Sequence, residues 1–158
     1  MSLIPAENCQ ISLDLIEKPA IFTSSSPDET FTLGKNIAPL LEKGSIVALY
    51  GPLGAGKTCL AKGIGEGFGV KEELTSPTYT IISEYEANLP LYHIDAYRLR
   101  GNDDFSAIGG EEIINGEGVY IIEWSDRIEE SIPDYAIRIN IQIIEDNIRR
   151  IHILKGKK

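Results

Sequence analysis

At 158 residues the chain is long enough for one domain with a full hydrophobic core and too short for two of ordinary size. Its composition, 42% hydrophobic and 25% charged, is that of a globular protein, and no apolar run approaches the roughly 20 residues of a membrane span. The formal net charge of −9 repels the phosphate backbone of nucleic acids, so any work on RNA or DNA would need a partner that grips it.

The N-terminus, MSLIPAENCQ, has no basic region followed by an apolar stretch, so no secretory signal is predicted and the cytoplasm is the expected compartment. Cys9 and Cys59 are interpreted as free thiols in a reducing compartment. His93 and His152 lie far apart in the sequence, and no paired-cysteine spacing accompanies them, so no zinc site is expected. One basic cluster near the C-terminus is interpreted as a solvated tail: Arg149, Arg150, Lys155, Lys157 and Lys158.

The first elements are a strand and a helix. Residues 10–22 alternate apolar and polar side chains and predict an early strand. The helix is expected to begin with Ser26 as N-cap, Pro27 in the first helical position and Glu29 as the capping-box partner. Apolar residues then recur at helical spacing over 31–41.

Residues 45–50 (SIVALY) form a continuous apolar run that is typical of a buried parallel strand, and a helix is predicted over 57–68. Further strands are predicted at 79–85, 91–94, 119–123, 135–144 and 149–154. The last two alternate with period 2, which favours an antiparallel C-terminal pair. The expected fold is α/β, a mostly parallel sheet flanked by helices, with 23–158 as one domain and 1–22 as an N-terminal extension able to form a strand.

The segment GPLGAGKT matches the phosphate-binding pattern G-x-x-x-x-G-K-[ST], and it follows a predicted strand and opens a predicted helix. Glycines let backbone N–H groups curl around an anion, and the helix N-terminus adds its partial positive charge. Lys57 supplies a cation for the β- and γ-phosphates, and the Thr58 hydroxyl can ligate Mg²⁺. The residues expected to contact ATP or ADP are Gly51, Leu53, Gly54, Ala55, Gly56, Lys57, Thr58 and Cys59.

A magnesium site needs an acidic residue at the end of a second buried strand. Glu123 ends VYIIE and Asp95 ends LYHID, and spacing alone does not rank the two. His93 alternates with Asp95 and is interpreted as a hydrogen-bonded structural histidine. Trp124, the single tryptophan, is equally compatible with core packing and with stacking near the nucleotide.

A third segment has the character of a switch. Ser76 and Thr78 offer hydroxyls, and Pro77 disfavours helix at Ser76, which leaves an extended loop. Such a loop can be ordered by a γ-phosphate with its Mg²⁺ and released on hydrolysis. The alternative is a plain loop that leads into a strand.

Four blocks, in this order and spacing, resemble the TsaE (YjeE) family, the bacterial ATPases of tRNA threonylcarbamoyladenosine synthesis. They are GPLGAGKT (51–58), SPTYT (76–80), LYHIDAYRL (91–99) and IIEWSDR (121–127). The resemblance covers about residues 25–154, and the combination is far more specific than a phosphate loop alone.

The resemblance implies a cytoplasmic P-loop protein that binds ATP or ADP with Mg²⁺ and hydrolyses ATP slowly until its partners stimulate it. Those partners are TsaB and TsaD, which modify the adenosine next to the anticodon. The chain would not transfer the threonylcarbamoyl group itself. It would meet tRNA only through the complex, and neither DNA nor a membrane is implied.

The resemblance also implies roles for individual residues. Lys57 would contact phosphate, and Thr58 and Glu123 would bind the metal, with Glu123 also serving hydrolysis. Asp95 would be a second residue important to activity, and Trp124 would lie near the nucleotide. The switch beside the γ-phosphate would be Ser76, Pro77, Thr78 and Tyr79.

Other functions compete with this interpretation. A small-molecule kinase of P-loop fold would need a lid with arginines, for which Arg98 and Arg100 are candidates, but no separate acceptor-binding segment is visible. A GTPase would need an N-K-x-D block, which does not occur. A regulatory module that binds nucleotide and acts only by docking remains a third hypothesis.

Overall fold

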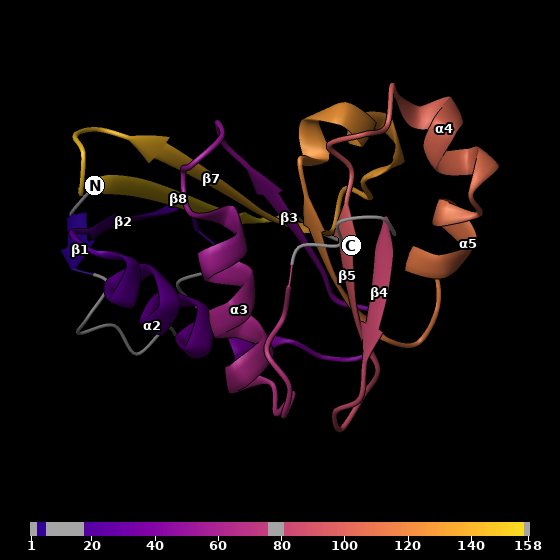
Figure 1. The fold of residues 1–158 in the computed structure, drawn as a ribbon, viewed down its shortest axis with the longest axis horizontal. Coiled ribbons are helices and arrows are strands. Elements are labelled where there is room, and N and C mark those ends of the chain that lie inside the picture. Colours follow the sequence, from indigo (N-terminus) through magenta and orange to yellow (C-terminus); the bar gives the residue numbers. More distant parts are fainter. Residues whose placement is uncertain (1–2, 6–17, 76–80, 157–158) are drawn as a thin grey trace.

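The computed structural model describes residues 3–5, 18–75 and 81–156. Its strands form one mixed sheet in the order β1-β2-β8-β7-β3-β6-β5-β4 (Figure 1). The strands are β1 (Leu3–Pro5), β2 (Ala20–Ser24), β3 (Ile46–Tyr50), β4 (Ile82–Tyr85), β5 (Leu91–Asp95), β6 (Val119–Glu123), β7 (Ile137–Ile143) and β8 (Arg149–Lys155).

Helices cover both faces of the sheet. They are α2 (Pro27–Ile37), the 3₁₀ turn η2 (Ala38–Leu40), α3 (Lys57–Gly67), α4 (Asn102–Ala107), α5 (Gly110–Ile114) and the 3₁₀ segment η3 (Ser125–Ser131). One core lies under α2 and α3 and includes Val47 and Leu49 of β3, whereas Ile46 and Ala48 of the same strand belong to a second core with α4, α5 and η3. β3 is therefore buried on both faces, as its continuous apolar run predicts.

The predicted α/β class is confirmed. The central strands β7, β3, β6 and β5 pair in parallel, and β7 and β8 form the expected antiparallel pair. Only β2 Ala20–Ser24 represents the strand predicted at 10–22, because residues 6–17 lie outside the described residues. Of the strand predicted at 79–85, residues 79–80 lie outside the described residues, and the strand that the structure shows is β4, Ile82–Tyr85. The division into an extension and a domain stays a prediction.

The start of α2 follows the predicted capping chemistry, but its end does not. The Ser26 hydroxyl accepts a hydrogen bond from the Glu29 backbone N–H at 3.2 Å, and the Glu29 carboxylate accepts one from the N–H of Ser25 at 2.6 Å. The helix ends at Ile37 and tightens into η2 rather than running to residue 41. Pro39 explains the difference, because it has no N–H to continue the α-helical pattern.

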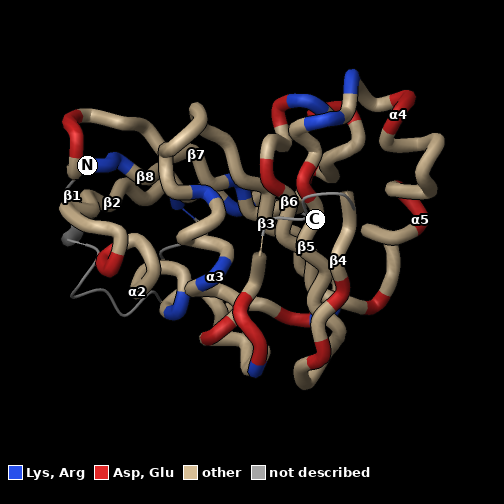
Figure 2. The backbone as a smooth tube through the Cα atoms, in the orientation of Figure 1, with Lys and Arg blue, Asp and Glu red and all other residues tan. Residues whose placement is uncertain are grey.

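Charge is dispersed over the molecule. Acidic residues occur along loops and helices on both sides of the sheet, with basic residues interspersed (Figure 2). Among the residues that the structure describes, no helix combines the length and apolar character needed to cross a membrane.

Glycines set how closely α2 and α3 approach. A Cβ added at Gly63 would overlap the carbonyl oxygen of Phe31, and one at Gly34 would overlap that of Leu60. The two helices therefore pack backbone against backbone, which holds α3 and the phosphate loop before it close to the sheet.

We expect Gly63→Ala to lower the free energy of unfolding by about 2 kcal/mol or more, because overpacking against a helix backbone outweighs the better helix propensity of alanine. Urea unfolding measures the change. Gly101→Ala is the matched control, since its backbone is extended and nothing lies within 4 Å of the added Cβ. Equal stability of the two variants would contradict the proposed close packing.

Candidate functional site

The loop between β3 and α3 is shaped by glycine. Gly51, Gly54 and Gly56 have φ of 145°, 77° and 109°, which side chains on an L-residue rarely allow. A Cβ at Gly51 would also lie 2.6 Å from the carbonyl oxygen of Ile141 on β7. The loop therefore turns tightly beside the sheet, and α3 begins directly after it at Lys57.

A cavity of about 350 Å³ opens beside this loop. Its lining comes from the phosphate loop, the start of α3 and the ends of β5 and β6: Leu53, Gly54, Gly56, Lys57, Thr58, Cys59, Asp95, Tyr97, Glu123 and Trp124. All but Tyr97 are among the predicted site residues. Of the remaining loop residues, Ala55 is buried and Gly51 packs against β7.

Glu123 is a buried carboxylate with a partner at each oxygen. Its Oε1 accepts a hydrogen bond from the Thr58 hydroxyl at 2.8 Å, and His93 Nε2 lies 2.5 Å from its Oε2. Glu123 is 2% exposed and His93 is 0% exposed, so water screens this cluster little. His93 is hydrogen-bonded as predicted, and its partner is the candidate metal-binding residue itself.

Asp95 occupies a different position from Glu123. The two residues are partners in the β5–β6 register, so they lie side by side at the carboxyl ends of neighbouring strands. Asp95 is only half-buried, and its carboxylate accepts the backbone N–H of Tyr97 at 3.0 Å. The structure therefore brings both candidate carboxylates to the cavity but links only Glu123 directly to the phosphate-loop helix.

Lys57 is folded back onto its own loop. Its Nζ donates to the carbonyl oxygens of Gly51 at 2.6 Å and Pro52 at 2.8 Å, and lies 3.9 Å from the centre of the Trp124 ring. Burial lowers the pKa of Lys57, an effect that the nearby carboxylates, Glu123 foremost, partly offset. The lysine is thus a desolvated cation at the floor of the cavity.

Trp124 has the core contacts that its sequence position allowed, and its stacking near a nucleotide stays a prediction. It packs partly into the second core and it lines the cavity. Its ring centre lies 4.9 Å from that of Tyr97, which Arg127 covers on the outside at 5.2 Å. Its φ of 56° is the single positive value among the described non-glycine residues, a conformation that costs about 1 kcal/mol or more.

Of the predicted switch loop and the two cysteines, the structure describes only Cys59. The expected switch loop, Ser76, Pro77, Thr78 and Tyr79, lies outside the described residues, as does Cys9. Cys59 is a free thiol, as predicted, with Sγ 3.2 Å from the carbonyl oxygen of Pro27, and burial raises its pKa.

Lys157 and Lys158 lie outside the described residues, and the interpretation of the rest of the C-terminal basic cluster as a solvated tail is wrong. Arg150 and Lys155 belong to β8, and the clearest exception is Arg149. This residue begins β8, and its guanidinium donates to the carbonyl oxygens of Ala55 at 3.1 Å and Gly54 at 3.3 Å. No local pattern in the sequence could have shown this contact, because it depends on β8 and β7 lying beside β3 in the sheet.

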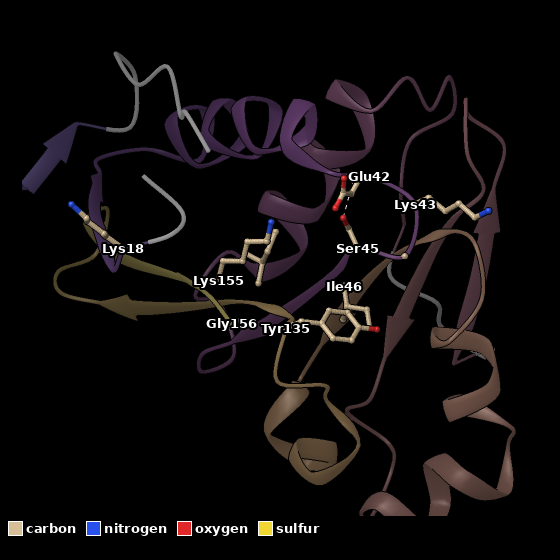
Figure 3. Close-up of a pocket in the computed structure, with 10 residues that line it drawn as sticks. Lys18, Glu42, Lys43, Ser45, Ile46, Tyr135, Lys155 and Gly156 are labelled. Atoms are coloured by element: carbon tan, nitrogen blue, oxygen red, sulfur yellow. Dashed lines mark hydrogen bonds between the residues drawn. The ribbon is translucent and has the colours of Figure 1, made fainter. Parts of the chain in front are cut away.

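A larger hollow of about 590 Å³ lies at the opposite ends of β3 and β7, where Ile46 and Ile137 begin those strands (Figure 3). Three lysines line it, and in the figure Lys18 and Lys43 point away from each other. It contains neither the glycine loop nor the paired carboxylates. The chemistry of the chain therefore concentrates in the smaller cavity.

Comparison with known proteins agrees with this geometry. The sequence model of the family described as "Threonylcarbamoyl adenosine biosynthesis protein TsaE" matches residues 24–151. The chain belongs to the TsaE family. The expected resemblance is thereby confirmed, and the matched span contains every residue that lines the cavity.

Individual TsaE relatives match most of the chain. The tRNA threonylcarbamoyladenosine biosynthesis protein TsaE of Treponema pallidum is 43% identical over 130 residues, which is 82% of this chain and 96% of that protein. The protein of the same name from Bacillus subtilis is 41% identical over 127 residues, 80% of this chain and 79% of the relative. A crystal structure of Bacillus subtilis YdiB superimposes with a TM-score of 0.70 at 37% identity, covering 86% of this chain and 84% of that one.

The lowered pKa of Lys57 gives a prediction for this TsaE family member. Between that pKa and the usual 10.5 the unfolded chain binds more protons than the folded one, so stability rises with pH through that window. At neutral pH the buried charge is therefore a cost. We expect Lys57→Met without nucleotide to be as stable as the parent or more stable by up to about 1 kcal/mol, while ATP affinity falls by about 100-fold or more.

Thermal unfolding and an ATP titration measure the two effects. Lys62→Met is the matched control, a lysine of the same helix that pairs on the surface with Glu73 at 2.7 Å. It should leave ATP affinity unchanged. A clear loss of stability in Lys57→Met would show that the contacts of Lys57 with the loop outweigh its desolvation.

Proposed function

We propose that the chain is a Mg²⁺-dependent ATPase acting in tRNA threonylcarbamoyladenosine biosynthesis. One observation carries the proposal: the hydroxyl that follows the phosphate-loop lysine is hydrogen-bonded at 2.8 Å to a buried carboxylate from the end of a neighbouring strand. Thr58 and Glu123 thus present two hard oxygen ligands beside the buried cation of Lys57.

The phosphate loop fits a nucleotide chain. Its glycines leave room where a Cβ would crowd β7 or strain the backbone, and the N–H groups in the first turn of α3 would be available to an anion. Lys57 would exchange the carbonyl oxygens of Gly51 and Pro52 for the β- and γ-phosphate oxygens. That exchange would give the buried ammonium group of Lys57 an anionic partner in place of two neutral carbonyl groups.

The same site fits Mg²⁺. Within the described part of the chain no three or more His, Cys, Asp or Glu side chains gather into a metal cage, so the protein alone supplies few ligands. Mg²⁺ commonly binds with one or two protein oxygens, waters and substrate phosphates, and Thr58 and Glu123 would be the protein's share. When bound, the ion neutralises charge that develops on the transferred phosphoryl group.

The other side chains around the cavity would position the catalytic carboxylate and the attacking water. His93 holds one oxygen of Glu123, so the carboxylate can keep its position when Thr58 turns to another partner. Glu123, with Asp95 beside it, would orient the attacking water and accept its proton as the bond from the γ-phosphorus to the ADP oxygen breaks. Trp124 and Tyr97, whose ring centres lie 4.9 Å apart, would form an aromatic wall beside the nucleotide.

The family relationship supports a partner-dependent role. We infer that TsaB and TsaD bind the chain in the cytoplasm, stimulate its slow hydrolysis and hold the tRNA. The net charge of −9 suits this division, because the chain itself repels the tRNA backbone.

A small-molecule kinase is less well supported. Its arginine lid would have to reach the cavity, but neither Arg98 nor Arg100 lines it. Arg100 instead pairs with Asp104 on α4 at 3.0 Å.

Replacing Glu123 with glutamine separates nucleotide binding from hydrolysis. We expect Glu123→Gln to bind ATP within about threefold of the parent and to lose turnover by about 100-fold, because the amide cannot take the proton of the attacking water. Fluorescence of Trp124, the single tryptophan, follows binding, and phosphate release follows turnover, with and without the TsaB–TsaD pair and tRNA.

Glu130→Gln is the control, an exposed glutamate that does not line the cavity, and it should match the parent in both assays. If Glu123→Gln supports threonylcarbamoyladenosine formation on tRNA as well as the parent does, the chain would instead be a module that acts by nucleotide binding alone. Transfer of the γ-phosphate to a metabolite would restore the kinase hypothesis.

A further inference from the structure

The guanidinium of Arg149 joins two segments far apart in the sequence. On one side Nε and Nη2 donate to the carbonyl oxygens of Ala55 and Gly54 in the phosphate loop, at 3.1 and 3.3 Å. On the other side Nη1 donates to three carbonyl oxygens of the β7–β8 turn, those of Glu145, Asp146 and Ile148, at 2.9 to 3.2 Å. One side chain therefore fixes the loop to the turn through five carbonyl groups.

The direction of these hydrogen bonds matters for anion binding. In a trans peptide the C=O and the next N–H point in opposite directions. With the Ala55 carbonyl held by Arg149, the N–H of Gly56 points away from the arginine, and Gly56 lines the cavity. The contact thus favours a loop with carbonyl oxygens outside and N–H groups available to phosphate.

Apolar packing holds the loop at Ala55, which is buried in the first core, but not at Leu53 and Gly54. Leu53 is 82% exposed, and nothing lies within 4 Å of a Cβ placed on Gly54. Gly54 also has a φ of 77°, so its backbone is intrinsically free to adopt other conformations. At Gly54, the hydrogen bond from Arg149 on β8 therefore adds a restraint that side-chain packing does not supply.

We propose that Arg149 is a positioning residue for nucleotide binding. It holds the outer carbonyl face of the phosphate loop against the β7–β8 turn, so that the loop is organised before the phosphates arrive. This rests on the proposed function, because it requires the loop to take a nucleotide. Arg149 acts through the loop backbone and does not itself touch the phosphates.

The test compares Arg149→Ala with Arg150→Ala in the full-length chain. Arg150 is the next residue of the same strand, and its side chain lies on the opposite face of the sheet. We expect Arg149→Ala to raise the dissociation constants of ADP and ATP, followed by Trp124 fluorescence, by about tenfold or more, and Arg150→Ala to change them less than about twofold.

Two further measurements separate positioning from general stability. Guanidinium chloride at about 10 mM, far below denaturing concentrations, should restore part of the lost nucleotide affinity in Arg149→Ala but leave the affinity of Arg150→Ala unchanged.

Arg149→Lys keeps the charge but cannot span both segments, so it should retain the fold and still bind nucleotide more weakly than the parent. If the parent binds nucleotide and Arg149→Ala binds it equally well, the positioning role of Arg149 would be overturned, but the proposed function would stand. A parent that binds no nucleotide would overturn the proposed function together with it.

Discussion

The buried carboxylate of Glu123 is the constraint on which the site depends. A charge with 2% exposure is costly unless each oxygen finds a partner, and here the partners come from two other elements, Thr58 of α3 and His93 of β5. The carboxylate therefore ties the phosphate-loop helix to the parallel strands. The rest of the fold keeps these three residues together: β5 and β6 align in parallel register, and the close approach of α2 to α3 holds the helix in place.

The phosphate loop lies between two cations of different function. Lys57 contacts its carbonyl oxygens from the cavity side, and Arg149 contacts others from the β8 side. We propose that Lys57 leaves its carbonyl partners for a stronger anion, whereas Arg149 is held by two separate segments. We propose that Lys57 binds the phosphates, while Arg149 keeps the loop backbone in the same conformation.

Sequence reasoning succeeded where the information is local. The glycine loop, the N-cap at Ser26 and the buried strand that ends at Glu123 are all patterns of a few consecutive residues. Spacing could not distinguish Glu123 from Asp95, because the difference between them is the hydrogen bond that Thr58 of α3 donates to Glu123. The contact from Arg149 depends on strand order and joins residues 94 positions apart, so no sequence pattern marks it. The switch role of Ser76 to Tyr79 stays a prediction.

The most direct measurement is a crystal structure with a non-hydrolysable ATP analogue and Mn²⁺ in place of Mg²⁺, with the ion located by its anomalous signal. If the proposed function is right, we expect Mn²⁺ beside the Thr58 hydroxyl, with Glu123 holding it directly or through water. Lys57 would then have moved from Gly51 and Pro52 to the β- and γ-phosphates. A nucleotide bound elsewhere, for example in the hollow lined by Lys18 and Lys155, or no metal beside Thr58, would contradict it.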